Sequence, residues 1–269
     1  MKQPGVDPFT QRTPRVVAAR RLQRRKERDS SGLFLAEGPQ AVREAMHVVV
    51  EVFVTADGLD RHHKLINMVR ATGAPLSVIT DEGLAALAET VTPQGVVAVC
   101  RQFDVTLSDA LTRRPRLVAV LAGVKDPGNA GTVLRTADAA GADAVLFAGE
   151  TVDPYNGKCV RASAGSLFHV DVVRAPDPFA AITALRDAGL TVLAADGYGS
   201  NDLDTLADDG ALHSSTAWLF GSEAHGLPAE LADFADARVR VPIHGRAESL
   251  NLAAAAAVCL YASARAQRT

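Results

Sequence analysis

Short apolar runs alternate with helical segments through the second half of this 269-residue chain, and this alternation restricts the fold more than any other feature. The runs are rich in valine, leucine and alanine and lack the period-two pattern of a strand with one exposed face. They lie at residues 117–121, 144–147, 170–173, 191–194, 217–220 and 237–241. Strands that are apolar on both faces are typical of a largely parallel sheet covered by helices on both sides. We therefore predict an α/β domain over residues 117–269, with helices at 130–140, 156–162, 179–188, 229–234 and 248–265.

The first hundred residues show a shorter version of the same pattern. Strands are expected at residues 33–36, 48–54, 76–79 and 95–100, and helices at 15–28, 39–46, 61–71 and 81–88. This predicts a second α/β domain over residues 14–103, preceded by a flexible tail at 1–13. The polar stretch 104–116, which ends near a proline, is predicted to be the linker between the domains.

The charge of the chain is distributed unevenly. Residues 1–28 hold nine lysines and arginines against two carboxylates, although the whole chain has a net charge of −3. Such a basic arm on an acidic body is typical of a local nucleic-acid contact, but it also fits a solvated basic helix. Removing two arginines of the arm distinguishes these interpretations. RNA affinity should fall if the arginines contact phosphates, and it should stay unchanged if the helix is merely solvated.

Cysteine and histidine spacing argues against a disulfide framework and against a metal site. Cys100, Cys159 and Cys259 are isolated, and no pair of histidines has a spacing that ligates a metal. We expect the cysteines to be buried apolar side chains. The N-terminus lacks the apolar core of a secretory signal, and no apolar run approaches the roughly 20 residues that cross a bilayer. These observations favour a cytoplasmic location and no membrane partner.

Three loops that follow predicted strands carry residues beyond those a simple connection needs. They are residues 125–131, 221–228 and 242–251, with the sequences KDPGNAG, GSEAHGLP and PIHGRAESLN. Each alone can be read as turn chemistry or helix capping. In an open parallel sheet, however, ligands bind beyond the carboxyl ends of the strands. We therefore predict a functional site where the three loops meet.

The sequence lacks the residues that other nucleotide-binding or hydrolytic α/β sites require. The loop at 125–131 contains two glycines but not the GxGxxG pattern of a dinucleotide site. The chain contains no GxxxxGK[ST] phosphate loop, and Gly165-Ser166 is not followed by the glycine of a nucleophile elbow.

The segments DPGNAGTVLRT, FGSEAHGLP and RVPIHGRAESLNLAAAAAVCLY resemble, in order, the three motifs of the SpoU branch of the SPOUT superfamily of RNA methyltransferases. The first domain, through GLFLAEGPQAVREA and TPQGVVAV, resembles the family's substrate-binding module, which is similar to ribosomal protein L30e. The resemblance implies S-adenosylmethionine as methyl donor and a ribose 2′-hydroxyl of RNA as acceptor. It also implies an α/β fold with a deep trefoil knot in the second domain, and an active homodimer.

Motif matching assigns the site residues. The catalytic residues implied by the resemblance are Asn129, Arg135, Glu223, Ser249 and Asn251. The cofactor-binding residues implied are Gly221, Val241, Ile243, Leu250 and Leu252. Their apolar side chains suit a flat adenine, and a glycine permits a close approach of the backbone.

Arg135 is the general base that the resemblance suggests. A guanidinium group keeps its proton in proteins, so this role is chemically unfavourable. We expect cationic Arg135 to stabilise the developing alkoxide or to hold the adjacent phosphate. Glu223, Ser249 and Asn129 would then position Arg135 and the ribose for an in-line transfer.

RNA contacts are predicted on both domains. Arg20, Arg21, Arg24 and Arg25 would form i, i+4 pairs on a helix that follows phosphates, and Lys158 with Arg161 resembles the family's basic helix. Surface salt bridging is the alternative for the latter pair. A ribosomal RNA of the large subunit is the favoured substrate, because transfer RNA enzymes of this family usually lack the N-terminal module. A transfer RNA methyltransferase and a catalytically silent RNA-binding factor with the same knot remain alternatives.

Overall fold

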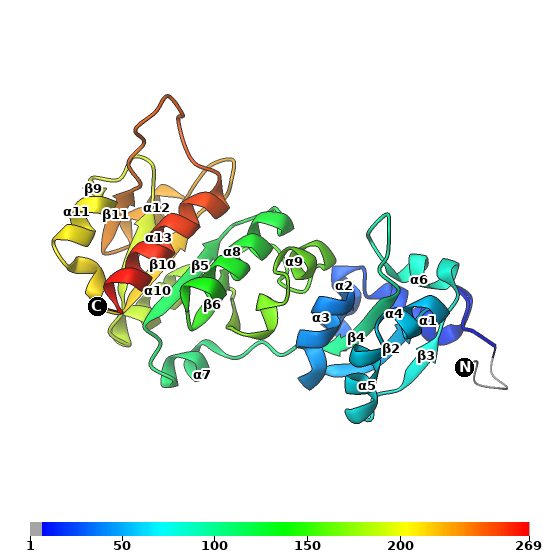
Figure 1. Ribbon diagram of the computed structural model, residues 1–269. Coiled ribbons are helices and arrows are strands. Elements are labelled where there is room, and N and C mark those ends of the chain that lie inside the picture. The colour runs from blue at the N-terminus through cyan, green and yellow to red at the C-terminus, as the bar shows by residue number, and fades with distance from the viewer. Residues whose placement is uncertain (1–6, 269) are drawn as a thin grey trace. The chain divides into compact units, whose positions relative to one another are not determined.

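The computed structural model describes residues 7–268 and divides the chain into two compact units (Figure 1). Unit 1 contains the residues up to Phe103 together with Tyr155–Gly165, and unit 2 contains Asp104–Pro154 and the residues from Ser166 onward. The chain therefore leaves unit 2 after Pro154, contributes a helix to unit 1, and returns. The sequence pattern placed this helix in the second domain, because periodicity reports which residues are helical but not which core they join.

Unit 2 is built on a seven-stranded sheet in the order β7-β6-β5-β10-β8-β11-β9. Its strands are β5 (Leu117–Ala122), β6 (Ala144–Ala148), β7 (Asp171–Ala175), β8 (Thr191–Ala195), β9 (Asn201–Asp202), β10 (Thr216–Phe220) and β11 (Ala237–Arg240). All neighbouring pairs are parallel, as the apolar runs predicted. The sequence pattern did not predict β9, because two polar residues carry no strand signal.

Alternate residues of these strands pack against different helices. Val118, Val120, Leu146 and Leu219 lie in one buried cluster with residues of α10 (Pro178–Asp187) and α12 (Ala229–Asp233). Successive side chains of a strand point to opposite faces, so the intervening residues face the other way. There Trp218 of β10 contacts Ser263 of the last helix. The sheet is thus buried on both faces, which explains its unbroken apolar strands.

Helices α8 (Pro127–Ala140) and α13 (Leu252–Ala266) pack side by side on this second face (Figure 1). Helix α13 also contacts β5, β8 and β10. The remaining helices of unit 2 are α7 (Leu107–Thr112), α11 (Leu203–Asp208) and two 3-10 turns, η2 (Ser166–Phe168) and η3 (Ala211–His213).

Unit 1 has a four-stranded sheet in the order β1-β4-β2-β3, in which β4 is antiparallel to both of its neighbours and β2 is parallel to β3. The strands are β1 (Leu33–Glu37), β2 (Val49–Val54), β3 (Leu76–Val78) and β4 (Val96–Arg101). The helices are α1 (Pro14–Arg21), α2 (Arg25–Ser31), α3 (Pro39–Glu44), η1 (Ala45–His47), α4 (Ala56–Arg61), α5 (His63–Ala71), α6 (Asp81–Leu87) and α9 (Gly157–Ala162).

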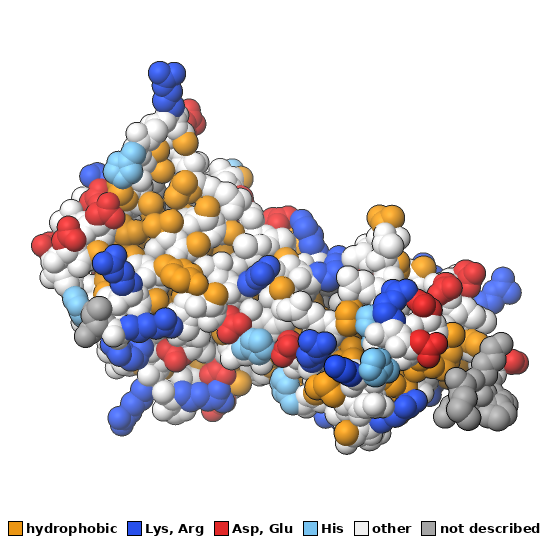
Figure 2. Space-filling view, viewed as in Figure 1, with side chains coloured by type: hydrophobic (Ala, Val, Ile, Leu, Met, Phe, Trp, Pro, Cys, Tyr) orange, Lys and Arg blue, Asp and Glu red, His pale blue; other side chains and the backbone are white. Residues whose placement is uncertain are grey.

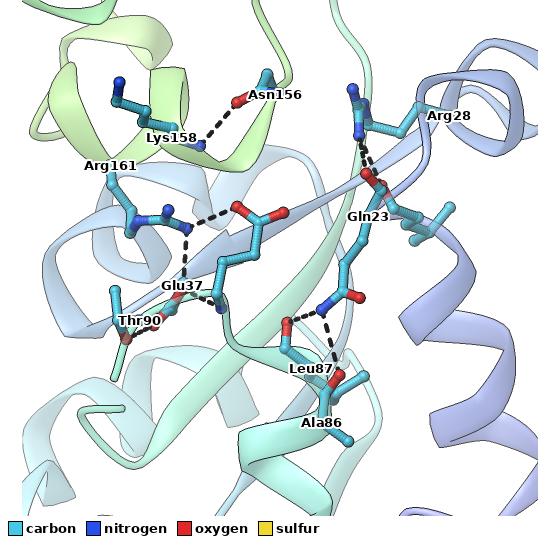
Figure 3. Close-up of polar contacts among 11 residues, drawn as sticks. Gln23, Arg28, Glu37, Ala86, Leu87, Thr90, Asn156, Lys158 and Arg161 are labelled. Carbon is cyan, nitrogen blue, oxygen red and sulfur yellow. Dashed lines mark hydrogen bonds and ion pairs between the residues drawn. The ribbon is translucent and has the colours of Figure 1, made fainter. Parts of the chain in front are cut away.

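The predicted helix over residues 15–28 is wrong in one respect, because the chain breaks into α1 and α2. The buried guanidinium of Arg28 donates to the carbonyl oxygens of Leu22 and Gln23, which therefore close a turn. The side-chain amide of Gln23 donates to the carbonyls of Ala86 and Leu87 and anchors this turn to the end of α6 (Figure 3). One cation of the basic arm is thus structural.

The predicted linker and tail also differ from the structure. Residues 104–116 belong to unit 2, where Val105 pairs with Val173 and α7 packs against β7. A polar composition concealed this packing, which uses the buried Ala110 and a few half-buried apolar side chains. The predicted tail lies partly outside the described residues, but Phe9 within it pairs with Ile79 and its ring lies 6.5 Å from that of Phe53.

Cys100, Cys159 and Cys259 are buried, as expected, and none of the three is joined in a disulfide. Burial raises the pKa of the Cys259 thiol to about 12 and that of Cys100 further, so neither forms a thiolate near neutral pH. Between residues 7 and 268, no group of three side chains is arranged to ligate a metal, and no helix is long and apolar enough to span a membrane.

Trp218 and Ser263 provide a test of how α13 is held on the sheet. Both are fully buried, and the indole Nε1 donates to the Ser263 hydroxyl at 2.9 Å. Ser263→Ala leaves a buried N–H without an acceptor, so we expect unfolding free energy to fall by about 1–3 kcal/mol. Denaturant unfolding followed by the fluorescence of Trp218, the only tryptophan, measures the change. The exposed Ser214→Ala is the matched control, and an equal effect of both variants would contradict the prediction.

Candidate active site

The three loops singled out in the sequence lie at the carboxyl edge of the unit 2 sheet. They follow β5, β10 and β11. In the sheet, β5 is next to β10, and β8 separates β10 from β11. Parallel strands bring loops that are far apart in the sequence to one edge.

A hydrogen-bonded network joins the three loops. The amide Nδ2 of Asn129 donates to Glu223 Oε1 at 3.0 Å, and Asn251 Nδ2 donates to Asn129 Oδ1 at 3.3 Å. Glu223 also accepts from the backbone N–H groups of Asp126 and Lys125 at 3.3 and 3.5 Å. Three of the five predicted catalytic residues are therefore in contact, and Asn129 lies at the centre with both amide ends in use.

Local capping positions the two asparagines. The Asp126 carboxylate accepts from the Asn129 backbone N–H at 2.8 Å, and Pro127 occupies the first turn of α8, so the helix begins three residues earlier than predicted. Asn251 Oδ1 accepts from Ala253 N–H at 2.9 Å and caps α13. Asn251 thus caps a helix with its oxygen and reaches the network with its nitrogen.

Helix α13 begins at Leu252, so the prediction of a helix from residue 248 is wrong. Residues 241–251 have no regular structure, and Ser249 lies exposed among them without joining the Asn129 network. The cap at Asn251 explains the difference, because its extended backbone cannot continue the helix toward the N-terminus.

Arg135 lies apart from the network. It is exposed on α8, six residues and about 9 Å of helix rise beyond Asn129. Its side chain makes no hydrogen bond or ion pair with any residue in the part of the chain that the structure describes. The carboxylate of Glu223 is occupied by three N–H donors instead, so the expected positioning of Arg135 by Glu223 and Asn129 is not seen within this chain.

The five predicted cofactor residues lie at the ends of β10 and β11 and at the start of α13. Gly221 is buried, Val241 and Leu252 are half-buried, and Ile243 and Leu250 each remain 38% exposed. Two exposed branched apolar side chains on one irregular loop offer surface for an apolar ligand.

Gly221 is required by its own loop. A Cβ at this position would lie 2.1 Å from the carbonyl carbon of Gly226. The loop returns on itself there, because Ser222 and Gly226 exchange two backbone hydrogen bonds of 2.9 Å. The glycine therefore lets the chain after β10 fold tightly and present Glu223, a simpler reason than a close approach to a ligand.

The sequence reading missed Tyr198, which follows β8 between the second and third loops and is 94% exposed. Its backbone N–H donates to Asp196, and Asp196 also pairs with Arg238 at 2.6 Å. Arg238 donates hydrogen bonds to the carboxylates of Asp196 and Asp233, and these bonds raise the pKa of Arg238 above its ordinary value. The glycines at 197 and 199 around one aromatic residue were the available signal.

Arg161, predicted to contact phosphate, is held by carboxylates within unit 1. Its Nη1 lies 3.1 Å from both Glu37 Oε2 and Glu89 Oε2, as Figure 3 shows for Glu37. Glu37 also accepts from the Glu89 backbone N–H and from the Thr90 hydroxyl. The guanidinium thus attaches α9 to β1 and to the segment after α6, and its charge is neutralised. Lys158, one turn earlier, is exposed.

The predicted arm arginines are all exposed, but they do not form i, i+4 pairs on one helix. Arg20 and Arg21 end α1, Arg24 caps α2, and Arg25 begins α2 and pairs with Asp29 at 3.5 Å. The side chains of Arg20, Arg21 and Arg24 make no ion pair with residues 7–268. The break between α1 and α2 changes the arrangement of the charges but leaves them accessible.

Family models match both parts of the chain. The SpoU rRNA methylase family matches residues 116–261, and an MRM3-like substrate binding domain matches residues 13–98. The chain is 36% identical over 251 residues to the 23S rRNA (guanosine(2553)-2′-O)-methyltransferase RlmP of Bacillus subtilis, with 90% of this chain and 92% of that protein covered.

Solved structures are similar along the whole chain. An AdoMet-bound rRNA methyltransferase from Sinorhizobium meliloti has a TM-score of 0.82 and 33% identity, with 94% of this chain and 95% of that chain covered. The SpoU methyltransferase AviRb from Streptomyces viridochromogenes, in complex with AdoMet, has a TM-score of 0.81 and 30% identity, with 95% of this chain and 99% of that chain covered.

Gly221→Ala tests the role of the tight loop after β10. The added methyl group meets backbone atoms, which cannot move aside as a flexible side chain can, so the loop and Glu223 must shift. We expect S-adenosylmethionine affinity to fall about tenfold or more in isothermal titration calorimetry, since small displacements in a preformed site weaken binding strongly. Gly197→Ala, where a Cβ meets nothing within 4 Å, is the control. Unchanged affinity in Gly221→Ala would contradict the prediction.

Proposed function

Because the chain belongs to the SpoU rRNA methylase family, we propose that it transfers a methyl group from S-adenosylmethionine to a ribose 2′-hydroxyl of large-subunit ribosomal RNA. The observation that carries the proposal is the network of Glu223, Asn129 and Asn251, which joins all three family motifs at the carboxyl edge of the sheet. A silent RNA-binding factor would have no need of this arrangement. The full-length similarity to rRNA methyltransferases favours ribosomal over transfer RNA.

The network would orient the acceptor ribose. Methyl transfer requires the 2′-oxygen in line with the sulfonium methyl group, so positioning contributes most of the catalysis. Glu223, held by backbone N–H groups, fixes the amide of Asn129, and Asn129 and Ser249 would face the ribose. S-adenosylmethionine, when bound, supplies an electrophilic methyl group, and Gly221, Val241, Ile243, Leu250 and Leu252 would hold it.

Cationic Arg135 would stabilise the developing alkoxide or hold the phosphate beside the target ribose. Its exposed position and lack of partners among the described residues support a contact with something outside this chain. RNA phosphates would also meet Lys158 and the arm residues Arg20, Arg21, Arg24 and Arg25, while Arg161 serves to hold α9 in unit 1.

A homodimer formed through unit 2 is part of the proposal. The residues Ala254, Val258 and Tyr261 recur every three or four positions and so lie on one face of α13. Val258 is 41% and Tyr261 52% exposed, and Figure 2 shows hydrophobic side chains gathered over this helix. An unpartnered apolar stripe of this kind is typical of an interface. The match of residues 116–261 to the SpoU family supports a trefoil knot in unit 2. Action on ribosomal RNA would place the enzyme in the cytoplasm.

Methyl incorporation into ribosomal RNA from a strain that lacks the protein tests the function. We expect the wild-type enzyme to methylate one ribose of the large-subunit RNA, mapped by primer extension, and to leave transfer RNA unmodified. Asn129→Asp replaces the N–H donor to Glu223 by a second carboxylate while keeping an oxygen that can accept from Asn251, so repulsion from Glu223 should displace the side chain and turnover should fall by about two orders of magnitude. Asn67→Asp, the same substitution at an exposed position of α5 in unit 1, is the control. Methylation of transfer RNA alone, or of neither RNA, would overturn the assignment.

Tyr261→Glu tests the dimer. A carboxylate buried in an apolar interface lacks a partner, so the dimer dissociation constant should rise about tenfold or more in analytical ultracentrifugation. Met68→Glu alters a comparably exposed apolar residue, 44% exposed on α5, and should leave the oligomeric state unchanged. A wild-type protein that is monomeric at micromolar concentration would refute the proposal.

A further inference from the structure

A cavity of about 320 Å³ lies beyond the ends of β5, β6 and β10, outside the predicted cofactor residues. Its apolar floor is formed by Ala122 and Gly123 at the end of β5 and by Ala148 and Gly149 at the end of β6. Ser222 and His225, from the loop after β10, contribute a hydroxyl and an imidazole. The volume is at the lower end of the range for small-molecule sites, about 300–1,000 Å³. A cavity in unit 1, beside Arg161, is only about 10 Å³ and holds a water molecule at most.

The cavity adjoins the network from the side opposite to the predicted cofactor residues. Lys125, which lines it, donates its backbone N–H to Glu223, and Ser222, which also lines it, precedes Glu223 in the chain. None of the five predicted cofactor residues lines it. Along the sheet order β6-β5-β10-β8-β11, the cavity lies over β6, β5 and β10, whereas the cofactor residues follow β10 and β11. Glu223 accepts from Lys125, which lines the cavity, and Asn129 connects Glu223 to Asn251, which Leu250 and Leu252 of the predicted cofactor set flank.

We propose that this cavity receives the unstacked base of the nucleotide whose ribose is methylated, an inference that rests on the proposed function. The base is bonded to C1′, the neighbour of the carbon that bears the reacting oxygen. The base and the 2′-hydroxyl lie on opposite faces of the ribose ring, so a ribose held at Glu223 and Asn129 with its 2′-oxygen toward the cofactor directs its base to the other side, where the cavity lies.

The lining suits a nucleobase in chemistry as well as in size. RNA-binding proteins recognise splayed-out bases by packing on their faces and by hydrogen bonding to their edges. Gly123 and Gly149, which follow two adjacent strands, are half-buried and have no side chain, so they leave room for a flat ring. His225 is exposed, and its ring can donate or accept a hydrogen bond. The Ser222 hydroxyl donates to the Gly226 carbonyl and accepts from the His225 backbone N–H, and it keeps a second lone pair as an acceptor. Base recognition and ribose positioning would thus share one loop, residues 221–228.

Gly123→Asn tests the proposal by adding a side chain to the floor. Gly123 has φ +70°, and a Cβ there meets nothing within 4 Å, so the side chain has room. Asparagine tolerates this backbone conformation better than most residues. We expect kcat/KM for ribosomal RNA to fall about tenfold or more, since loss of base packing is a loss of substrate binding. Affinity for S-adenosylmethionine should stay within about twofold of the wild type, because the two sites share no lining residue.

Gly189→Asn is the matched control. Gly189 has φ +87° with nothing within 4 Å of an added Cβ, and it lies in the same unit without lining the cavity. It should retain wild-type kcat/KM. Thermal unfolding of both variants separates a general loss of stability from a local effect.

A substrate that carries an abasic ribose at the methylated position distinguishes base binding from a structural role of Gly123. The wild-type enzyme should methylate it at least about tenfold more slowly than intact RNA, and Gly123→Asn should add no further loss, since the missing base and the filled cavity remove the same contact. Wild-type activity in Gly123→Asn, or an equal penalty on both substrates, would overturn the cavity assignment. A wild-type enzyme that methylates no RNA would overturn the proposed function itself, and this inference with it.

Discussion

The parallel pairing of β5 with β10 is the contact on which the site depends. These strands are separated by about a hundred residues in the sequence, and their register places the loop after Ala122 directly beside the loop after Phe220. Helices α8 and α13 bury one face of this pair, and the cluster around α10 and α12 buries the other. Because both faces are covered, the strand ends cannot shift without disturbing two cores, and the loops they carry are held accordingly.

Helix capping converts this rigid edge into a site. Asp126 and Asn251 cap the two helices that lie side by side, so the first residues of α8 and α13 are fixed against the strand ends. The remaining amide nitrogen of Asn251 then meets Asn129, and Asn129 meets Glu223. The side chains that cap the N-termini of α8 and α13 thus also orient the polar groups proposed to face the ribose. Gly221 contributes by letting the loop that carries Glu223 turn back on itself.

Unit 1 shows how a charged residue can be assigned the wrong role from sequence. Arg28 and Arg161 both lie in basic segments, yet each is engaged by oxygen atoms of unit 1 and holds the fold together. Arg20, Arg21 and Arg24 look no different in the sequence, but their side chains are exposed and without such partners among residues 7–268. Only this second group has charge available for a phosphate.

The sequence by itself determined the fold class, the order of nearly all strands and helices, and the three loops that meet, because apolar periodicity and cap residues are local signals. It also carried the family resemblance through its motifs. Tertiary structure alone decided that α9 joins unit 1, that α13 starts at Leu252, that Glu223 bonds to Asn129 rather than Arg135, and that a cavity opens beside Ser222. These features depend on which distant residues compete for the same partner, and no local pattern records that competition.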